Sequence, residues 1–240
     1  MIDAARNELL TPGVLRVGIN LGNILLVTGK SENGDPEGVA PDMGRAFANW
    51  LGVEAQYVTF GTPGEVADAA AHGKWDVCLI AQEPKRAEVI FFCNSYVGIE
   101  ATYLVPSGSP FHSVAELDKP GVDIAVSARS AYDLFLSRTL KYATLHRAKG
   151  LAGAFQLFVD KELDALAGLV PALIENAKAI PGARVIPGCY TAVQQAIGTQ
   201  HGKFALHGEV ETFLAQAKSS GLIAKLVEKH GVSGKLVVAI

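Results

Sequence analysis

WDVCLIAQEPKRAEVIFF, residues 75–92, gives the strongest indication of how this chain folds. Its nearly all-apolar run, Val77–Ala81, predicts a buried strand, and a short polar turn then leads back into apolar sequence. Arg86 stands in that turn. Arginine stays charged at any biological pH and binds a carboxylate through two parallel hydrogen bonds. The stretch therefore predicts a strand end that holds a cation for a small anion, although a surface ion pair with Glu83 or Glu88 would explain the same arginine.

Predicted strands alternate with predicted helices on the N-terminal side of this stretch. Apolar residues recur at helical spacing from Val39 to Leu51, with Pro41 and Asp42 in the first turn and Gly52 after the last. The other predicted elements here are the strands Val14–Asn20 and Tyr57–Phe60 and the helix Glu65–Ala71. This alternation predicts a mostly parallel sheet that is covered by helices on both faces.

A second alternating series begins near Val122, after a long predicted strand, Ile99–Val105, and a loop rich in proline and glycine. We interpret this change as a crossing into a second lobe. The predicted strands of the series are Ile124–Ser127, Leu163–Leu169 and Arg184–Ile186, and its predicted helices are Ala131–Leu140, Ala154–Val159 and Pro171–Ala179. An extended segment, Thr191–Gly198, would carry the chain back, before two amphipathic helices, Val210–Lys218 and Leu222–Lys229. The pattern predicts an α/β protein of two lobes.

Composition indicates an ordinary globular protein. With 240 residues and 49% hydrophobic content, the chain is long enough to bury roughly 70–75% of its unfolded surface. The net charge is −3 and the basic residues are scattered, which argues against a nucleic-acid partner. No apolar run is long enough for a membrane-spanning helix. The first residues contain no secretory signal, so we expect either a processed chain or a cytoplasmic protein.

Neither a metal site nor a cofactor is predicted. The three cysteines, Cys78, Cys93 and Cys189, lie far apart, which indicates neither a zinc site nor a disulfide framework. None of the six histidines stands four residues from a carboxylate in a convincing frame, and the segment from His201 to His207 is interpreted as a solvated loop. No glycine-rich nucleotide motif or serine-hydrolase motif is present.

Four segments, taken in order, resemble the family 3 extracellular solute-binding proteins, the amino-acid-binding receptors of ABC importers. They are LRVGIN (15–20), GVAPDMGRAFANWLG (38–52), WDVCLIAQEPKRAEVIFFCNSY (75–96) and SGLIAKLVEKHG (220–231). The resemblance covers nearly the whole chain and implies a type II periplasmic-binding-protein-like fold with two crossing strands as the hinge. Lobe one would be residues 1–101 with 194–240, and lobe two would be residues 102–193.

The function that this resemblance implies is that of a receptor, not an enzyme, that closes on a small carboxylate-bearing solute, either an amino acid or an organic acid. It implies a periplasmic monomer with an ABC transporter permease as its partner, and no cofactor. Two alternatives stay open. One is a lyase on the same scaffold, similar to cyclohexadienyl dehydratase, with Glu83 as its proton donor; the other is a sensor module that signals to a protein partner.

The ligand-binding residues follow from the same resemblance. Arg86 would hold the ligand carboxylate in lobe one, and the turn around Ser130 would bind it in lobe two through the amides at a helix start. Ser130 would equally serve as a helix N-cap, and Arg129 is either a second cation or an exposed residue. The full set of expected ligand-binding residues is Asn20, Asn23, Ala81, Glu83, Arg86, Arg129, Ser130, Ala131 and Tyr132.

Several of these residues have a second interpretation. Asn20 and Asn23 would either contact a polar ligand or form a turn beside Gly22. Tyr132 and Phe92 would either line the ligand site or belong to the core.

One departure from the family pattern affects the ligand. Family members that bind amino acids usually have an aspartate for the ligand ammonium after a strand of lobe two, and Leu169 stands near that place here. Either Glu83 or Glu100 replaces it, or the ligand is a carboxylate without an amino group.

Overall fold

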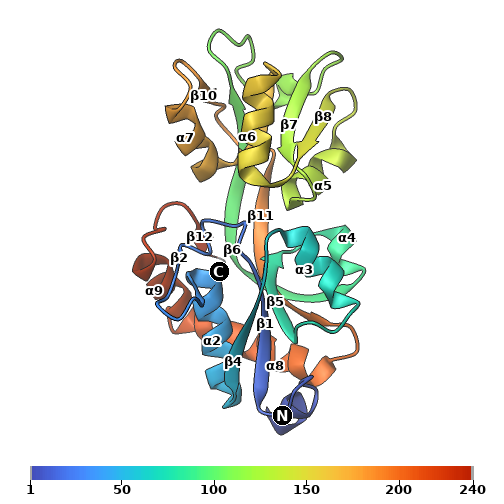
Figure 1. Cartoon of the computed structure of the whole chain (residues 1–240), viewed down its shortest axis with the longest axis vertical. Helices are drawn as coiled ribbons and strands as arrows, with labels where there is room; N and C mark the ends of the chain where they lie inside the picture. Colours follow the sequence, from blue (N-terminus) through green and yellow to red (C-terminus); the bar gives the residue numbers. More distant parts are fainter. Residues whose placement is uncertain (1, 239–240) are drawn as a thin grey trace. The chain divides into compact units, whose positions relative to one another are not determined.

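The computed structural model describes residues 2–238. Its internal contacts divide the chain into two compact units. Unit 1 is Met1–Gly98 with Gln194–Ile240, and unit 2 is Ile99–Val193. Two long strands, β6 (Ile90–Val105) and β11 (Thr191–Gln200), carry the chain from one unit to the other (Figure 1).

The sheet of unit 1 brings its strand ends to one edge. β1 (Val14–Asn20) pairs in parallel with β4 (Glu54–Phe60) and with β5 (Val77–Ala81). β11 pairs antiparallel with β5 on the other side, where Gln195 lies opposite Ala81. The predicted strands Val14–Asn20 and Val77–Ala81 are confirmed to the residue.

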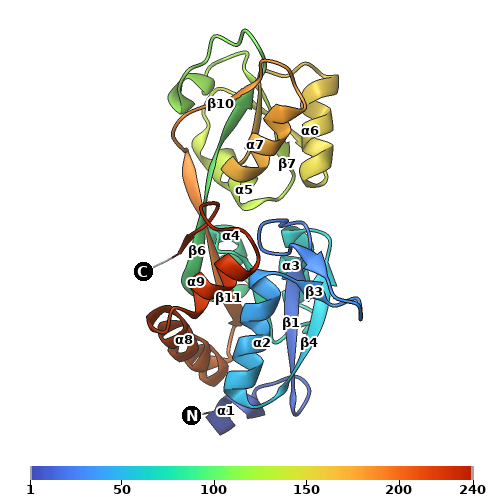
Figure 2. The same ribbon diagram turned by 90° about the vertical axis from the view of Figure 1, so that its left-hand side faces the viewer.

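Helix α2 (Val39–Leu51) packs on β1 and β4, as its apolar spacing predicts. The helix can approach β1 closely because residue 44 is glycine; a Cβ there would lie 2.6 Å from Val17 Cγ1. Gly52 ends the helix in the left-handed conformation, with φ of 67°. The other helices of unit 1 are α1 (Ile2–Asn7), α3 (Pro63–Ala70), α4 (Pro84–Ala87), α8 (Phe204–Ser219) and α9 (Leu222–Lys229). Helices α8 and α9 pack against each other and against α2 (Figure 2).

Unit 2 has its own strands around β9 (Ala165–Leu169). β9 pairs in parallel with β7 (Asp123–Ser127) and antiparallel with the second half of β6. β7 pairs in parallel with the edge strand β8 (Thr144–Ala148). Helix α6 (Gly150–Asp160) packs on β7, β8 and β9 and buries Phe158 in a core with Leu173. The remaining elements are the 3₁₀-helix η1 (Val114–Leu117), α5 (Ala131–Thr139), α7 (Val170–Lys178) and β10 (Arg184–Val185).

The predicted α/β class with a mostly parallel sheet is confirmed, but some elements differ from the expectation. β6 begins at Ile90, nine residues before the predicted start at Ile99. The interpretation of His201–His207 as a solvated loop is wrong, because α8 begins at Phe204 and His207 is half-buried against Phe91. The unpredicted elements are α1, α4, η1, β8 and the two-residue strands β2 (Gly29–Lys30), β3 (Pro36–Glu37) and β12 (Val237–Val238). Within residues 2–238, no helix has both the length and the apolar character that a membrane crossing needs.

Candidate functional site

The candidate residues of unit 1 gather where its central strands end. β1 ends at Asn20 and β5 ends at Ala81, and the parallel pairing of Ile19 with Leu79 brings these two ends to the same edge of the sheet. Asn20 and Ala81 are both buried. Loops that leave this edge are the usual ligand-binding positions in parallel sheets.

Arg86 is fixed against the end of β5. It lies in the short helix α4, and its guanidinium donates a 2.8 Å hydrogen bond from Nη1 to the carbonyl oxygen of Ala81. Only 4% of its surface is exposed, which argues against the alternative of a surface arginine. Arg86 also has further polar interactions. The sequence predicted a polar turn at this place, whereas the structure places a buried cation in a single helical turn.

Glu83 builds that turn. Its carboxylate accepts a 2.8 Å hydrogen bond from the backbone N–H of Lys85, so Glu83 is the N-cap of α4, and Pro84 follows at the first helical position. Glu83 is buried as well. The two ionisable residues that the sequence singled out here therefore belong to one compact, buried structure.

The two asparagines after β1 form turns, as one of their two interpretations expects. Asn20 Oδ1 accepts a 3.0 Å hydrogen bond from the Gly22 N–H, and Asn23 Oδ1 accepts one of 3.2 Å from the Leu25 N–H. Each side-chain oxygen is thus engaged by the loop. A ligand contact of either residue would use its amide nitrogen or the second lone pair of its side-chain oxygen.

The candidate residues of unit 2 lie at the end of β7. Ser130 is the N-cap of α5, because its hydroxyl accepts a 3.0 Å hydrogen bond from the Asp133 N–H. Arg129, just before it, has a φ of 59°, in the left-handed region that non-glycine residues rarely adopt. Ala131 begins the helix and is buried. A strained turn that leads into a capped helix is one way in which a chain positions backbone amides for an anion.

Tyr132 is buried beneath this turn. Burial raises the pKa of its phenol to about 12. Hydrogen bonds with the Ser130 and Ser127 side chains lower this pKa, but burial has the larger effect. The phenol is therefore neutral at physiological pH and ties the turn to the end of β7. Leu169 is the last residue of β9, where it is buried and precedes the first residue of α7 as its N-cap.

Sequence reasoning missed the residue that holds the unit 2 turn together, Asp133. Its buried carboxylate accepts a 2.7 Å hydrogen bond from the Arg129 N–H and a 3.0 Å charge-assisted bond from Arg147 Nε. Arg147 lies on β8, which was not predicted.

Replacing Asp133 with asparagine should lower the free energy of unfolding by about 1.5–3 kcal/mol, the usual contribution of hydrogen bonds to a charged group. Urea denaturation followed by circular dichroism measures this difference. Glu175→Gln is the matched control, because Glu175 pairs with Lys178 on the exposed surface and should contribute less than about 0.5 kcal/mol. Equal stability of the Asp133→Asn variant and the parent would contradict this role of Asp133.

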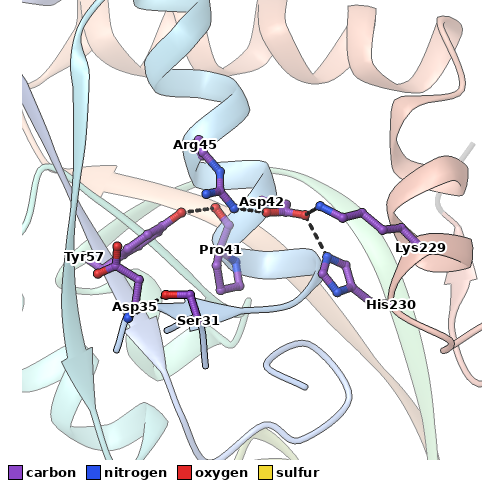
Figure 3. A network of polar contacts seen from close by, with 8 residues as sticks. All are labelled: Ser31, Asp35, Pro41, Asp42, Arg45, Tyr57, Lys229 and His230. Atoms are coloured by element: carbon purple, nitrogen blue, oxygen red, sulfur yellow. Dashed lines mark hydrogen bonds and ion pairs between the residues drawn. The ribbon is translucent and has the colours of Figure 1, made fainter. Parts of the chain in front are cut away.

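A second polar cluster in unit 1 surrounds Asp42, in the first turn of α2 (Figure 3). Its carboxylate binds Lys229 Nζ at 2.7 Å, His230 Nε2 at 2.7 Å and the Arg45 guanidinium. Nearby, the Tyr57 hydroxyl donates a 3.0 Å hydrogen bond to the carbonyl of Pro41 (Figure 3).

This Asp42 cluster joins the start of α2 to the end of α9. Burial alone would raise the pKa of Asp42, but hydrogen bonds from Lys229, His230 and Arg45 together lower it to about 2. The carboxylate already has three cationic or polar partners, so we interpret the cluster as a structural connection and not as part of a ligand site.

The chain was compared with known protein families and with solved structures. A sequence model of bacterial extracellular solute-binding proteins, family 3, matches residues 15–233. No curated protein matches the chain.

Several solved structures are similar over most of the chain. One is the ancestral amino acid-binding protein AncCDT-1, described as a precursor of cyclohexadienyl dehydratase, with 27% identity, a TM-score of 0.77 and coverage of 93% of this chain and 97% of that chain. Another is the amino acid ABC transporter substrate-binding protein AbpA from Streptococcus pneumoniae bound to L-arginine, with 18% identity, a TM-score of 0.76 and coverage of 93% and 97%. A third is a histidine kinase sensor domain with similarity to periplasmic binding proteins, with 18% identity, a TM-score of 0.78 and coverage of 94% and 98%. The last two likenesses show the fold alone, and they agree with the fold class predicted from the sequence.

Proposed function

Because the chain belongs to the bacterial extracellular solute-binding proteins of family 3, we propose that its solute is a small molecule with a carboxylate group, an amino acid or a closely related organic acid. The similar structure at 27% identity is an amino acid-binding protein. The carboxylate is the group that such ligands share, so a receptor for them needs a fixed cation.

The observation that carries this proposal is the position of Arg86. Arg86 is only 4% exposed and its guanidinium is hydrogen-bonded to the end of β5, so little side-chain entropy is lost when it binds an anion. Arginine also matches the geometry of a carboxylate. We therefore assign Arg86 as the anchor for the ligand carboxylate.

In unit 2 the proposed contribution comes from the start of α5. The first-turn amides of Ala131 and Tyr132 have no acceptor within the helix, and the helix dipole favours an anion there. The Ser130 hydroxyl stands beside them as the N-cap. Arg86 is thus the candidate anchor of the proposed lobe one, residues 1–101 with 194–240, and the start of α5 belongs to the proposed lobe two, residues 102–193. β6 and β11 are the proposed hinge.

Amino acids and organic acids differ in the ammonium group, which only an amino acid carries. Leu169 offers no charge at the place where an aspartate is usual, so a bound amino acid would need Glu83 or Glu100 for its ammonium. Glu83 is buried and close in sequence to Arg86, whereas Glu100 is exposed. We propose Glu83 for this role if the ligand is an amino acid.

The proposed setting follows from the family. We propose a monomer that acts outside the cytoplasmic membrane and delivers its solute to an ABC transporter permease. The match to a family of bacterial extracellular solute-binding proteins supports this setting.

Isothermal titration calorimetry tests the proposed ligand class. The panel contains the common amino acids and, for each, the organic acid of the same carbon skeleton without the amino group. We expect binding in the micromolar range or tighter for one chemical group of carboxylates. If the amino acids bind and their deaminated partners do not, an ammonium site is present. No heat of binding with any carboxylate, under conditions in which the protein is folded, would contradict the proposal.

One observation favours an enzyme as the second candidate, namely the likeness to a protein described as a precursor of cyclohexadienyl dehydratase. Glu83 would then be the proton donor, because it is a buried carboxyl group near a cation. Incubation with prephenate and with arogenate, followed by chromatography, distinguishes the two functions. A receptor leaves both compounds unchanged.

A further inference from the structure

Three metal-ligating side chains meet in unit 1 on elements that the proposed solute site does not use. They are Cys93 on β6 and His207 and Glu211 on α8, and their donor atoms all lie within 4.8 Å of one another. His207 and Glu211 are four residues apart, so they lie one turn apart on the same face of the helix. In the sequence, the four-residue spacing of His207 and Glu211 does not by itself predict a metal site, because the third ligand, Cys93, lies 114 residues before His207 and only the fold brings it to this helix.

The hydrogen bond of His207 decides which of its ring nitrogens could bind a metal ion. Its Nε2 lies 3.3 Å from the carbonyl oxygen of Phe92, to which it donates, so Nδ1 is left as the nitrogen with the lone pair. Metal-binding histidines commonly donate their other N–H to a carbonyl in this way. The ring also stacks on Phe91, with centroids 3.7 Å apart and planes 12° apart, which restricts its rotation.

The carboxylate of Glu211 is oriented by the residue next to Cys93. Asn94 donates its backbone N–H to Oε1 and its side-chain Nδ2 to Oε2, both at 2.8 Å. Each oxygen keeps a second lone pair that can face a cation. Cys93 is 2% exposed, and its thiol lies 3.8 Å from the carbonyl oxygen of His207. The segment 92–94 therefore supplies one ligand and also positions the other two.

We propose that Cys93, His207 and Glu211 form a binding site for Zn²⁺. One sulfur, one nitrogen and one oxygen donor suit this ion, whereas Ca²⁺ and Mg²⁺ prefer oxygen donors alone. Cys93 releases its thiol proton to solvent when the ion binds, and the resulting thiolate and the Glu211 carboxylate together neutralise the charge of the ion. Zinc bonds of about 2.0–2.3 Å in a tetrahedron place the donors roughly 3.3–3.8 Å apart, so the three side chains need to close by about an ångström. Water completes the fourth position, and the ion fastens β6 to α8.

Cobalt titration of the untagged protein is the direct experiment, because Co²⁺ occupies zinc sites and reports its ligands through absorption. The parent should bind one equivalent and show a sulfur-to-cobalt charge-transfer band together with the visible bands of a tetrahedral ion. Zn²⁺ should remove both. The Cys93→Ser variant should lack the charge-transfer band. His207→Gln and Glu211→Gln should weaken binding by more than about tenfold. Loss of a residue that only orients a ligand already costs about tenfold or more, and loss of the ligand itself costs more than that.

Two control variants remove a residue of the same type elsewhere. Cys189→Ser removes an exposed thiol and His72→Gln an exposed imidazole, and neither should change the titration. Saturating Zn²⁺ should also raise the unfolding temperature of the parent but not of Glu211→Gln, a largely surface change that keeps the fold. Absence of a charge-transfer band in the folded parent would overturn the proposal. So would a band that persists in Cys93→Ser and disappears in Cys189→Ser.

Discussion

Replacement of Arg86 with methionine should weaken ligand binding by at least about 100-fold, or roughly 2.7 kcal/mol. Methionine keeps much of the buried volume but removes the charge and the donors, and loss of one partner from a desolvated charged pair typically costs 2–5 kcal/mol. Calorimetry with the ligand identified from the amino-acid and organic-acid panel measures the change. Arg86→Lys should bind with intermediate affinity, because it keeps the charge without the paired donors.

The matched control for this prediction is Lys85→Met. Lys85 lies in the same short helix next to Arg86 but is exposed, so its removal should leave affinity within about threefold of the parent. Arg86→Met also leaves the Ala81 carbonyl without its hydrogen bond, so its unfolding curve should be recorded beside the binding data. A folded Arg86→Met variant with the affinity of the parent would rule out Arg86 as the anchor.

Replacement of Asp42 with asparagine should lower the free energy of unfolding by about 2 kcal/mol at pH 7. The side chain of Asp42 is 6% exposed, but those of Arg45 and Lys229 are 51% and 60% exposed, so the loss should stay below the 3–5 kcal/mol typical of a fully buried pair. The pKa of Asp42 leads to a similar loss of stability, because it is lowered from 3.8 to about 2. Each pKa unit corresponds to about 1.4 kcal/mol of free energy. Urea denaturation of both proteins measures the difference.

The pH dependence gives a second test of the Asp42 cluster. Because the pKa of the folded state lies below that of the unfolded state, the stabilisation is complete above about pH 4 and is lost as the pH falls toward 2. The difference in stability between the parent and Asp42→Asn should therefore narrow over this range. Asp35→Asn, an exposed carboxylate in the same region, serves as the control and should change stability little. A difference that stays constant down to pH 2 would contradict the assignment.

The elements that the sequence predicted well are those with a clear local pattern. α2 has apolar residues at helical spacing, a proline in the first turn and a glycine at its end, and the structure confirms the helix with its predicted end before Gly52. β8 was missed because it is a half-exposed edge strand, with the sequence TLHRA, that shows neither a buried run nor a clear alternation. The first half of β6 was missed because its apolar stretch has no regular period, so only pairing within the fold identifies it as a strand.

The candidate site was predictable only in part, because some of its residues follow from a local pattern and others depend on contacts between distant parts of the chain. Residues at the ends of buried strands, such as Asn20 and Ala81, follow from the strand assignment itself. Partners that are distant in the chain do not. Lys229 lies 187 residues from Asp42 and His207 lies 114 residues from Cys93, and neither pair has a local signal. The burial of Arg86 also depends on how α4 folds back onto β5.

We assign Arg86 as the residue that binds the carboxylate of the ligand, and calorimetry with a ligand and its carboxamide is the decisive experiment for this assignment. The carboxamide keeps the shape of the ligand but removes the negative charge. The parent should bind it at least about 100-fold more weakly than the acid, whereas Arg86→Met should bind both forms with similar, low affinity. Equal affinity of the parent for the acid and the carboxamide would contradict the account.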